Sequence, residues 1–460
     1  MPRATACRLV YSLLTANGAV QAELDTAFGR GILADADKAL CTELVYGSLR
    51  WHLRLKWYAG RLLRAPESLP PAMHSILVVA LYELFFTRVP AYATVNTYVA
   101  LVRKNFGQTL ARVANGVLRA SSAGDFFDDA QYGSIADHTE RMACQYALPP
   151  WVVALWVQAY GLETAQALME ASVMAPPVGL RLVPVQGQGA LFASLAPLAI
   201  SQNELSQPCR EEGRTLAFSG PLPQAAVEAL ATGRATRQAA ASQDALMALQ
   251  PRHWPGPVWD ACAGRGGKTL ALLEMGVPVT LASDIAPGRL RGLASSLSPY
   301  GEKAPAVARL AADTVTLRDL LHACPAMQAG MTHARQTTSG TGPETGMGGE
   351  VGGFGTILVD APCSGLGTLA RRPEIRLRRT PADALALASL QGRILQNLAT
   401  FVRPGGLLVY ITCTVNPAEN EEQVDAFLGH VPEFVLEETY RTPSTSQLGE
   451  FFFAVRFRKQ

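Results

Sequence analysis

Two cysteines stand where this chain could place reactive sulfur. Cys363 follows an apolar run that ends in an aspartate, within "TILVDAPCSGLG", and Cys413 ends a second apolar run, "LLVYITC". A cysteine can act as a nucleophile, bind a metal, form a disulfide or simply fill space in a core. Both runs are typical of strands, so we expect the two sulfurs at strand ends, where open α/β sheets bind ligands.

Metal binding and disulfide formation are the weaker interpretations of this pair. Neither cysteine has another Cys or His nearby at a metal-ligand spacing, and the eight cysteines of the chain include no CxxC pair, so we expect no metal site. A mutual disulfide is geometrically possible, but it is unlikely in the cytoplasm, where thiols stay reduced. Nucleophilic catalysis is the remaining interpretation.

A thiolate at such a place suits one reaction on a pyrimidine. Cytosine C5 is a poor nucleophile toward a methyl donor, but addition of a thiolate to C6 makes C5 electron-rich, so that methyl transfer becomes possible. The adduct must then lose the C5 proton and expel the thiolate, which requires a base. Asp360, at the end of the first run, could hydrogen-bond N3 or the amino group of the ring.

A glycine-rich turn follows another expected strand, in "PVWDACAGRGGKTLALLE". Its glycines let the backbone approach a ligand closely, and the next helix offers free N–H groups. Asp284 ends the following strand, the place from which an acidic residue binds ribose hydroxyls. The turn could also be purely structural, and it does not by itself separate a nicotinamide cofactor from S-adenosylmethionine. The spacing GRGG is not GxGxxG, which favours S-adenosylmethionine.

The expected elements divide the 460 residues into three regions. Residues 1–135 show helical spacing of apolar residues and predict an all-α domain. Residues 136–245 predict a linker and a small middle α/β domain. In residues 246–460 strands and helices alternate, which predicts a Rossmann-like domain with a doubly wound, mostly parallel sheet. Its last strand, "FFFAVRFRK", is expected at an antiparallel edge, and a Gly-rich segment at about 326–355 is expected to be a flexible insertion.

The composition is that of a soluble globular protein, 48% hydrophobic and 17% charged, with a net charge of +2. This charge identifies no partner, so any basic patch must be local. The apolar run from Ile76 to Phe86 is too short to span a membrane and is broken by Glu83. The N-terminal segment is expected to be an amphipathic helix rather than a signal peptide, and we predict a cytoplasmic protein.

Four motifs resemble, in order, those of the RNA cytosine-C5 methyltransferases of the Fmu/Sun (RsmB) type. They read "DACAGRGGKT", "DIAPGRL", "VDAPCSGLGTLARRPEI" and "YITCTVNPAENEEQV". The segments "ELVYGSLR" and "VANGVLR" make the N-terminal domain similar to the RNA-binding domain of the antitermination factor NusB, and "APPVGLRL" resembles the family's small middle domain. The resemblance covers essentially the whole chain. It implies an S-adenosylmethionine-dependent methyltransferase that acts on rRNA of the small subunit.

The resemblance also implies roles for individual residues. Cys413 corresponds to the nucleophile, Cys363 corresponds to the cysteine that assists product release, and Asp360 and Lys268 lie near the target base. The positions that correspond to the S-adenosylmethionine site are Cys262, Ala263, Gly264, Arg265, Gly266, Gly267, Lys268, Asp284, Asp313 and Asp360.

Two positions depart from the family pattern. Arg265 replaces the usual proline of the cofactor loop, which removes a rigid residue and adds a cation near the donor's carboxylate. Val183 stands where the family has an asparagine in its middle domain, which weakens the expectation that this domain contacts RNA in the usual way.

Five arginines cluster after Cys363, in "ARRPEIRLRR". Such a run is often only a solvated face, but its place beside the catalytic loop favours phosphate binding, and we predict RNA contacts for Arg371, Arg372 and Arg376. Basic residues of the helical domain could extend the surface: Arg50, Arg54, Lys56, Arg103, Lys104, Arg112 and Arg119. The target base must leave its stack to reach a thiolate, so unpaired RNA is the expected substrate, bound by a monomer.

Two functions of other classes remain open. A nicotinamide-dependent oxidoreductase would bind nicotinamide and not S-adenosylmethionine. A non-catalytic NusB-like RNA-binding protein would bind RNA and leave its cytosines unmodified.

Overall fold

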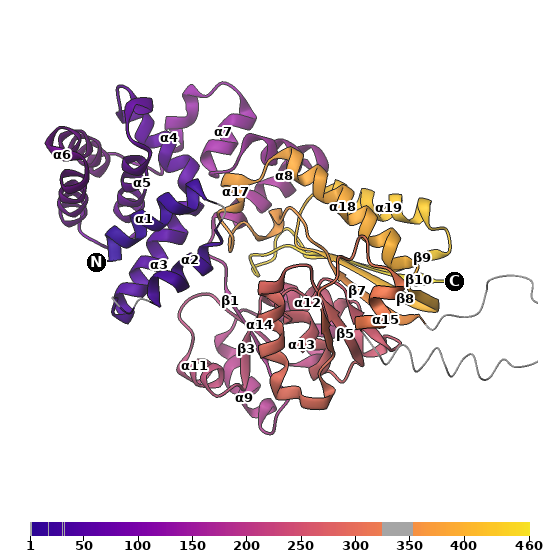
Figure 1. Ribbon diagram of the computed structural model, residues 1–460. Coiled ribbons are helices and arrows are strands. Elements are labelled where there is room, and N and C mark those ends of the chain that lie inside the picture. The colour runs from indigo at the N-terminus through magenta and orange to yellow at the C-terminus, as the bar shows by residue number, and fades with distance from the viewer. Residues whose placement is uncertain (1, 17, 30, 32, 324–352) are drawn as a thin grey trace, which may run out of the picture. The chain divides into compact units, whose positions relative to one another are not determined.

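The computed structural model describes the chain except residues 1, 17, 30, 32 and 324–352, so most of the predicted insertion at 326–355 lies outside the described residues. The chain forms two compact units (Figure 1). One comprises Met1–Ala175 with Thr368–Arg379, and the other comprises Pro176–Gly367 with Thr380–Gln460. No helix among the described residues is long and apolar enough to cross a membrane.

The first unit is all-α. Its helices are α1 (Pro2–Thr15), α2 (Val20–Phe28), α3 (Asp35–Arg50), α4 (His52–Leu62), α5 (Pro71–Phe86), α6 (Ala91–Ala123), α7 (His138–Gln145), α8 (Pro150–Val173) and α17 (Ile375–Arg378). The central helix is α5, which contacts α1, α3, α4 and α6, because its apolar residues cover nearly its whole circumference. The helix that begins at Ala91 bends at Gly107, where φ is 83°, a value that glycine adopts without strain.

The second unit is built on a seven-stranded sheet of order β6-β5-β4-β7-β8-β10-β9. Its strands are β4 (Val258–Asp260), β5 (Val279–Ser283), β6 (Ala306–Ala308), β7 (Phe354–Asp360), β8 (Val402–Thr412), β9 (Phe434–Arg441) and β10 (Phe453–Lys459). Strands β4 to β8 run parallel, while β10 pairs antiparallel with β8 and β9. The prediction that the last strand lies at the edge is therefore wrong, because β9 adds to it and takes the edge position.

Helices cover both faces of this sheet, which confirms the doubly wound fold (Figure 1). They are α12 (Ala240–Ala248), α13 (Gly267–Glu274), α14 (Pro287–Leu297), α15 (Leu317–Ala323), α18 (Pro381–Ala399) and α19 (Glu421–His430). Apolar residues of α18 and α19 pack on one face, and those of α12 and α13 pack on the other. Helix α18 starts sharply because Thr380 and Asp383 form a reciprocal capping box and Pro381 takes the first helical position.

A small antiparallel sheet of order β2-β1-β3 precedes the large one within the second unit. Its strands are β1 (Val178–Leu182), β2 (Thr215–Phe218) and β3 (Ala235–Arg237). Arg181 of β1 forms a buried 2.9 Å ion pair with Glu274 at the end of α13, and its guanidinium also donates to Gly267 O at 2.8 Å. The small sheet is thereby tied to the helix that follows the glycine-rich loop. Helices α7 and α8, which the sequence analysis placed in the middle region, belong to the helical unit.

Candidate active site

The predicted site residues follow neighbouring parallel strands of the large sheet. Asp284 follows β5, Cys262 follows β4, Asp360 ends β7 and Cys413 follows β8. Since β5, β4, β7 and β8 are adjacent in that order and parallel, their carboxyl ends meet at one edge. The structure therefore brings the two cysteines and the glycine-rich loop to the same edge of the sheet.

The two cysteines are in direct contact. The Sγ atoms of Cys363 and Cys413 lie 3.3 Å apart, and both side chains are half-buried. The hydrogen bond with Cys413 and burial raise the pKa of the Cys363 thiol well above its ordinary value. Either sulfur can be the donor in this contact, so the two thiols are placed to exchange a proton.

The loops that carry the cysteines are joined through their backbones. Ala361 N donates to Ile411 O at 2.8 Å, and Gly367 N donates to Cys413 O at 3.1 Å. A side chain at Gly367 would collide with Phe451 O, so this close approach requires glycine. The relative position of the two sulfurs is consequently fixed by the backbone on either side of Cys363.

Lys268 and Asp360 form an ion pair beside the cysteines. Lys268 Nζ lies 2.7 Å from Asp360 Oδ2, and it also lies 5.5 Å from the centroid of the Phe452 ring. The lysine side chain is 7% exposed and that of Asp360 is 35% exposed, so the carboxylate is the more accessible partner. A ligand at this edge of the sheet can reach Asp360, while Lys268 holds its charge in place.

The glycine-rich loop is shaped by positive φ angles. Gly264 has φ 59° and Gly266 has φ 87°, after which α13 begins at Gly267. A Cβ at Gly266 would collide with Leu293, whereas the space beside Gly264 is open. The loop therefore exposes backbone at the start of a helix, the arrangement that suits a ligand bound through N–H groups.

The acidic residues around this loop differ in their surroundings. Asp284 accepts hydrogen bonds from Gly264 N at 3.1 Å and Ala286 N at 2.7 Å, so it fixes the loop from the next strand. Asp313 follows β6 and lies 3.6 Å from Arg393.

Two other residues of the loop have different surroundings. Arg265, which stands in place of the family's proline, is exposed. Cys262 is half-buried, and burial together with the charge of Asp260 raises its pKa.

Asp260 is a buried acid that the sequence analysis did not include in the site. It is fully buried at the end of β4, and one carboxylate oxygen accepts from Thr269 Oγ1 at 2.6 Å. Its Oδ1 has no hydrogen-bond partner among the described residues. Burial raises the pKa of Asp260 to about 7. Its position at a strand end, directly before the glycine-rich loop, was the signal that could have identified it.

The arginine run after Cys363 belongs to the helical unit, and part of it is buried there. Arg376 is 2% exposed, and its guanidinium donates to Arg50 O at 2.8 Å and Ser172 O at 2.6 Å. These carbonyls lie at or near the ends of α3 and α8, where helices leave carbonyl groups unsatisfied. The predicted RNA contact of Arg376 is therefore wrong. Arg371 is half-buried, and Arg372 is 54% exposed beside Glu374.

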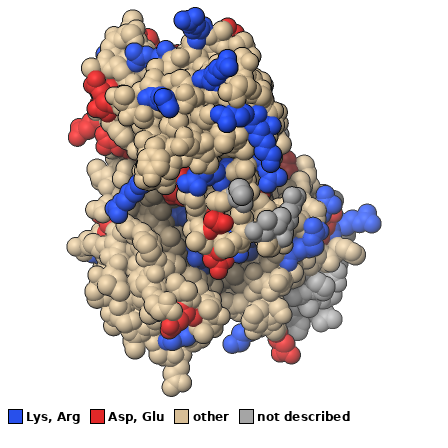
Figure 2. All heavy atoms as spheres, turned by 90° about the vertical axis from the view of Figure 1, so that its left-hand side faces the viewer, with Lys and Arg blue, Asp and Glu red and all other residues tan. Residues whose placement is uncertain are grey.

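The basic residues of the helical unit also divide into buried and exposed ones. Arg50 and Arg54 are 7% and 5% exposed and donate to backbone carbonyls, so they are not available to RNA. The exposed residues are Lys56, Arg103, Lys104, Arg112 and Arg119. Figure 2 shows lysine and arginine side chains gathered over the face of this unit that carries α6.

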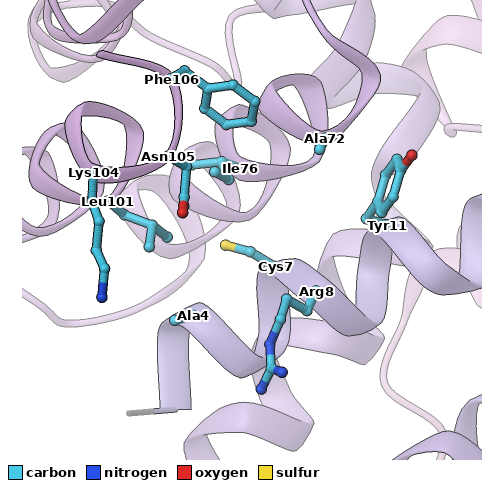
Figure 3. Close-up of a pocket in the computed structure, with 10 residues that line it drawn as sticks. All are labelled: Ala4, Cys7, Arg8, Tyr11, Ala72, Ile76, Leu101, Lys104, Asn105 and Phe106. Atoms are coloured by element: carbon cyan, nitrogen blue, oxygen red, sulfur yellow. The ribbon is translucent and has the colours of Figure 1, made fainter. Parts of the chain in front are cut away.

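A pocket of about 390 Å³ opens on the helical unit between α1, α5 and α6 (Figure 3). Cys7, Ile76 and Leu101 give it an apolar floor. Arg8 and Lys104 are exposed and add two positive charges to its lining. The pocket therefore combines an apolar interior with a cationic margin.

Among the described residues there is no group of three or more His, Cys, Asp or Glu side chains that could hold a metal ion.

The fold and the site together define a class of protein. A doubly wound sheet with a glycine-rich loop after its first strand and an acidic residue after the next binds a nucleoside cofactor at its carboxyl edge. The same architecture occurs in the crystal structure of a methyltransferase homolog protein from Pyrococcus horikoshii, with a TM-score of 0.51 and 21% identity over 71% of this chain and 100% of that one. This likeness establishes the fold alone.

Sequence comparisons identify the family. The profile of the 16S rRNA methyltransferase RsmB/F family matches residues 326–457, and that of the NusB family matches residues 1–123. The ribosomal RNA small subunit methyltransferase B of Klebsiella pneumoniae is 31% identical over 90% of this chain and 87% of its own length. A probable ribosomal RNA small subunit methyltransferase B of Synechocystis is 33% identical over 88% of this chain and 84% of its own length.

The chain belongs to the RsmB/F family of methyltransferases. Its cofactor is S-adenosylmethionine, and the open, positive-φ glycine loop with Asp284 beside it fits a nucleoside with a charged amino-acid tail.

Proposed function

We propose that this enzyme methylates C5 of a cytosine in small-subunit rRNA through a covalent bond between Cys413 and the base. Membership of the RsmB/F family and the printed names of its relatives support rRNA as the substrate. The observation that carries the C5 chemistry is the contact of two sulfurs, 3.3 Å apart, at the ligand-binding edge of the sheet. A methyltransferase that acts on an exocyclic nitrogen or a ribose hydroxyl has no use for two thiols there.

The first step in this proposal belongs to Cys413. Its thiolate attacks C6 of the cytosine, the S–C6 bond forms, and the electron pair of the C5–C6 double bond moves toward C5. Cys363 remains protonated in contact with it, because the hydrogen bond with Cys413 and burial raise the pKa of its thiol. Asp360, held by Lys268 at 2.7 Å, is the group we place at the N3 or amino edge of the ring.

Methyl transfer and release complete the reaction. S-adenosylmethionine, when bound at the glycine loop, would supply the methyl group to C5 and leave as S-adenosylhomocysteine. A base then removes the C5 proton, the C5–C6 double bond re-forms, and the bond to Cys413 Sγ breaks, which returns the thiolate. We assign assistance in this release to Cys363, whose sulfur contacts the leaving sulfur.

The helical unit is proposed to bind the RNA substrate. It matches the NusB family, and several of its exposed cations lie on α6, while Arg8 and Lys104 line the pocket of Figure 3. Such cations would contact phosphates without reading sequence. Arg371 and Arg372 are the predicted members of the arginine run that remain proposed RNA contacts.

The direct test is to map 5-methylcytosine in unmodified small-subunit rRNA after incubation with the protein and S-adenosylmethionine. We expect 5-methylcytosine with the wild type and none with Cys413→Ala. RNA that is bound but left unmodified would instead indicate a non-catalytic RNA-binding protein. Binding of a nicotinamide cofactor without binding of S-adenosylmethionine would indicate an oxidoreductase.

A further inference from the structure

A buried carboxylate joins the two cysteine loops. Glu419 lies in the 3₁₀ turn Pro417–Glu419, six residues after Cys413 in the chain, and it is 0% exposed. One of its oxygens accepts from Ser364 N at 2.7 Å, directly beside Cys363. The other oxygen accepts from Asn416 Nδ2 at 2.9 Å, on the loop that carries Cys413.

Two further donors complete the surroundings of this carboxylate. Ser364 Oγ donates to Glu419 Oε1 in a short hydrogen bond, and Gln391 Nε2 of α18 donates to Oε2 at 3.0 Å. The same Gln391 nitrogen donates to Pro362 O at 2.8 Å, so α18 contacts the residue before Cys363 as well. Ser364 Oγ and Thr414 Oγ1 lie 2.7 Å apart, which adds a direct link between the residues that follow the two cysteines.

The arrangement fits a side chain that ends in two acceptor oxygens. Each oxygen of Glu419 accepts two hydrogen bonds from neutral donors, which uses the acceptor capacity of a carboxylate without requiring it to donate. A glutamine at this position would turn an NH₂ group toward two donors and lose both hydrogen bonds. The group is buried away from water, so such a loss would not be compensated by solvent.

Resting on the proposed function, we propose that Glu419 is the positioning residue of the cysteine pair. It holds the loop after Cys363 and the loop after Cys413 together, so that the two sulfurs stay in contact through attack and release. It touches neither sulfur and acts through Ser364 and Asn416.

The charge of Glu419 has a second effect on the pair. The pKa of the Cys363 thiol is raised most by the hydrogen bond with Cys413, then by burial and by the charge of Cys413. The negative charge of Glu419 raises it further, by a smaller amount. Replacement of Glu419 therefore lowers the pKa of Cys363 in two ways: it removes the negative charge, and it lets the two sulfurs separate. A merely structural glutamate elsewhere in the fold would leave the titration of Cys363 unchanged.

The test uses the full-length protein and two readouts. The first is alkylation of Cys363 by iodoacetamide across pH, followed by peptide mass spectrometry in the absence of RNA. The second is the kcat and KM of methylation. For Glu419→Gln we expect Cys363 alkylation to begin at lower pH than in the wild type and kcat to fall at least tenfold, with KM for RNA and S-adenosylmethionine changed by less than about twofold.

The matched control is Glu437→Gln, which removes a carboxylate that pairs with Arg456 at 3.1 Å, between β9 and β10 and away from the cysteines. It should leave both readouts as in the wild type. An alkylation profile of Glu419→Gln that superimposes on the wild type, or a kcat within twofold of it, would overturn the proposal.

If Glu419→Gln does not fold, Glu419→Asp decides. It keeps the charge but shortens the reach by one methylene, so the two loops are no longer held together. We therefore expect a kcat at least tenfold lower and Cys363 alkylation that begins at lower pH than in the wild type, because the hydrogen bond with Cys413 is lost. An unchanged kcat in this variant would reject the positioning role. If the wild-type protein methylates no cytosine, the proposed function fails, while the alkylation profiles still decide whether Glu419 controls the cysteine pair.

Discussion

The roles that we propose for Cys363 and Cys413 rest on the contact between their sulfurs. Their sulfurs lie 3.3 Å apart, and the hydrogen bond with Cys413 raises the pKa of the Cys363 thiol. The proposed reaction needs one sulfur that attacks the base and a second that assists its release. The sequence predicts both thiols at strand ends, and the structure adds that the two sulfurs are in contact.

Asp260 leads to a prediction about pH and stability. Its pKa is raised to about 7 by burial, above the 3.8 of an exposed aspartate. Between about pH 4 and pH 7 the unfolded chain therefore releases this proton more readily than the folded protein, so stability falls as pH rises through that window. The cost reaches about 4 kcal/mol at the upper end, as an order of magnitude.

The substitution Asp260→Asn keeps an acceptor for the Thr269 hydroxyl and cannot ionise. We expect this variant to gain stability over the wild type progressively from pH 4 to pH 7 in the cofactor-free protein. Urea unfolding at several pH values measures the difference. Parallel pH dependence of the two proteins would show that Asp260 titrates normally.

Among the elements, the turn between β4 and α13 depends most on backbone conformation. Gly266 has φ 87°, and an added Cβ would collide with Leu293. The substitution Gly266→Ala should move the backbone that meets the cofactor, and we expect it to weaken binding of S-adenosylmethionine at least tenfold by calorimetry.

The control for this loop is Gly276→Ala. Gly276 also has a positive φ, 78°, but a Cβ there meets no atom within 4 Å. It should cost about 1 kcal/mol of stability through backbone strain and leave the affinity for S-adenosylmethionine unchanged. Equal affinity losses in the two variants would show that general destabilisation, and not the loop, is responsible.

Elements differed in how far the sequence could predict them. The apolar runs that became β7 and β8 were recognisable because nearly every residue is buried from both sides. Strand β9 was missed because most of its residues are exposed and its sequence, FVLEETYR, shows no regular apolar alternation. As a result the last strand was assigned to the edge, although it lies between β8 and β9.

The arginine run shows a different limit. Five arginines in nine residues predict a cationic surface, and nothing in the sequence distinguishes the one that points inward. Arg376 is buried because carbonyls at the ends of α3 and α8 need donors, a requirement set by helices far away in the chain. The network around Glu419 was likewise invisible, since Ser364, Gln391 and Asn416 come from three separate segments.

At the scale of the whole molecule, the chain crosses between its two compact units within the catalytic region. It leaves the second unit at Gly367, contributes Thr368–Arg379 to the helical unit and returns at Thr380. The segment that follows the Cys363 loop is therefore anchored by Arg376 inside the unit proposed to bind RNA. Neither unit is made from a continuous stretch of chain.

The proposed RNA surface of the helical unit gives a prediction about salt. Lys104 and Arg112 are exposed on α6, so Lys104→Glu with Arg112→Glu should weaken binding of small-subunit rRNA several-fold. The slope of log affinity against log salt should fall by roughly 0.7 for each lost phosphate contact. The charge-matched control is Lys303→Glu with Arg403→Glu, because these exposed residues lie at the amino ends of β6 and β8. Equal losses in the two proteins would place the RNA elsewhere.

The central claim is that Cys413 bonds to the base and Cys363 assists its release. The most direct measurement is mass spectrometry of Cys363→Ala after incubation with small-subunit rRNA and S-adenosylmethionine. We expect an RNase-sensitive protein–RNA adduct that yields, on digestion, a peptide with a methylated cytidine on Cys413, and no adduct when Cys413 is also replaced by Ala. Normal methylation by Cys363→Ala without any adduct, or an adduct on another residue, would contradict the account.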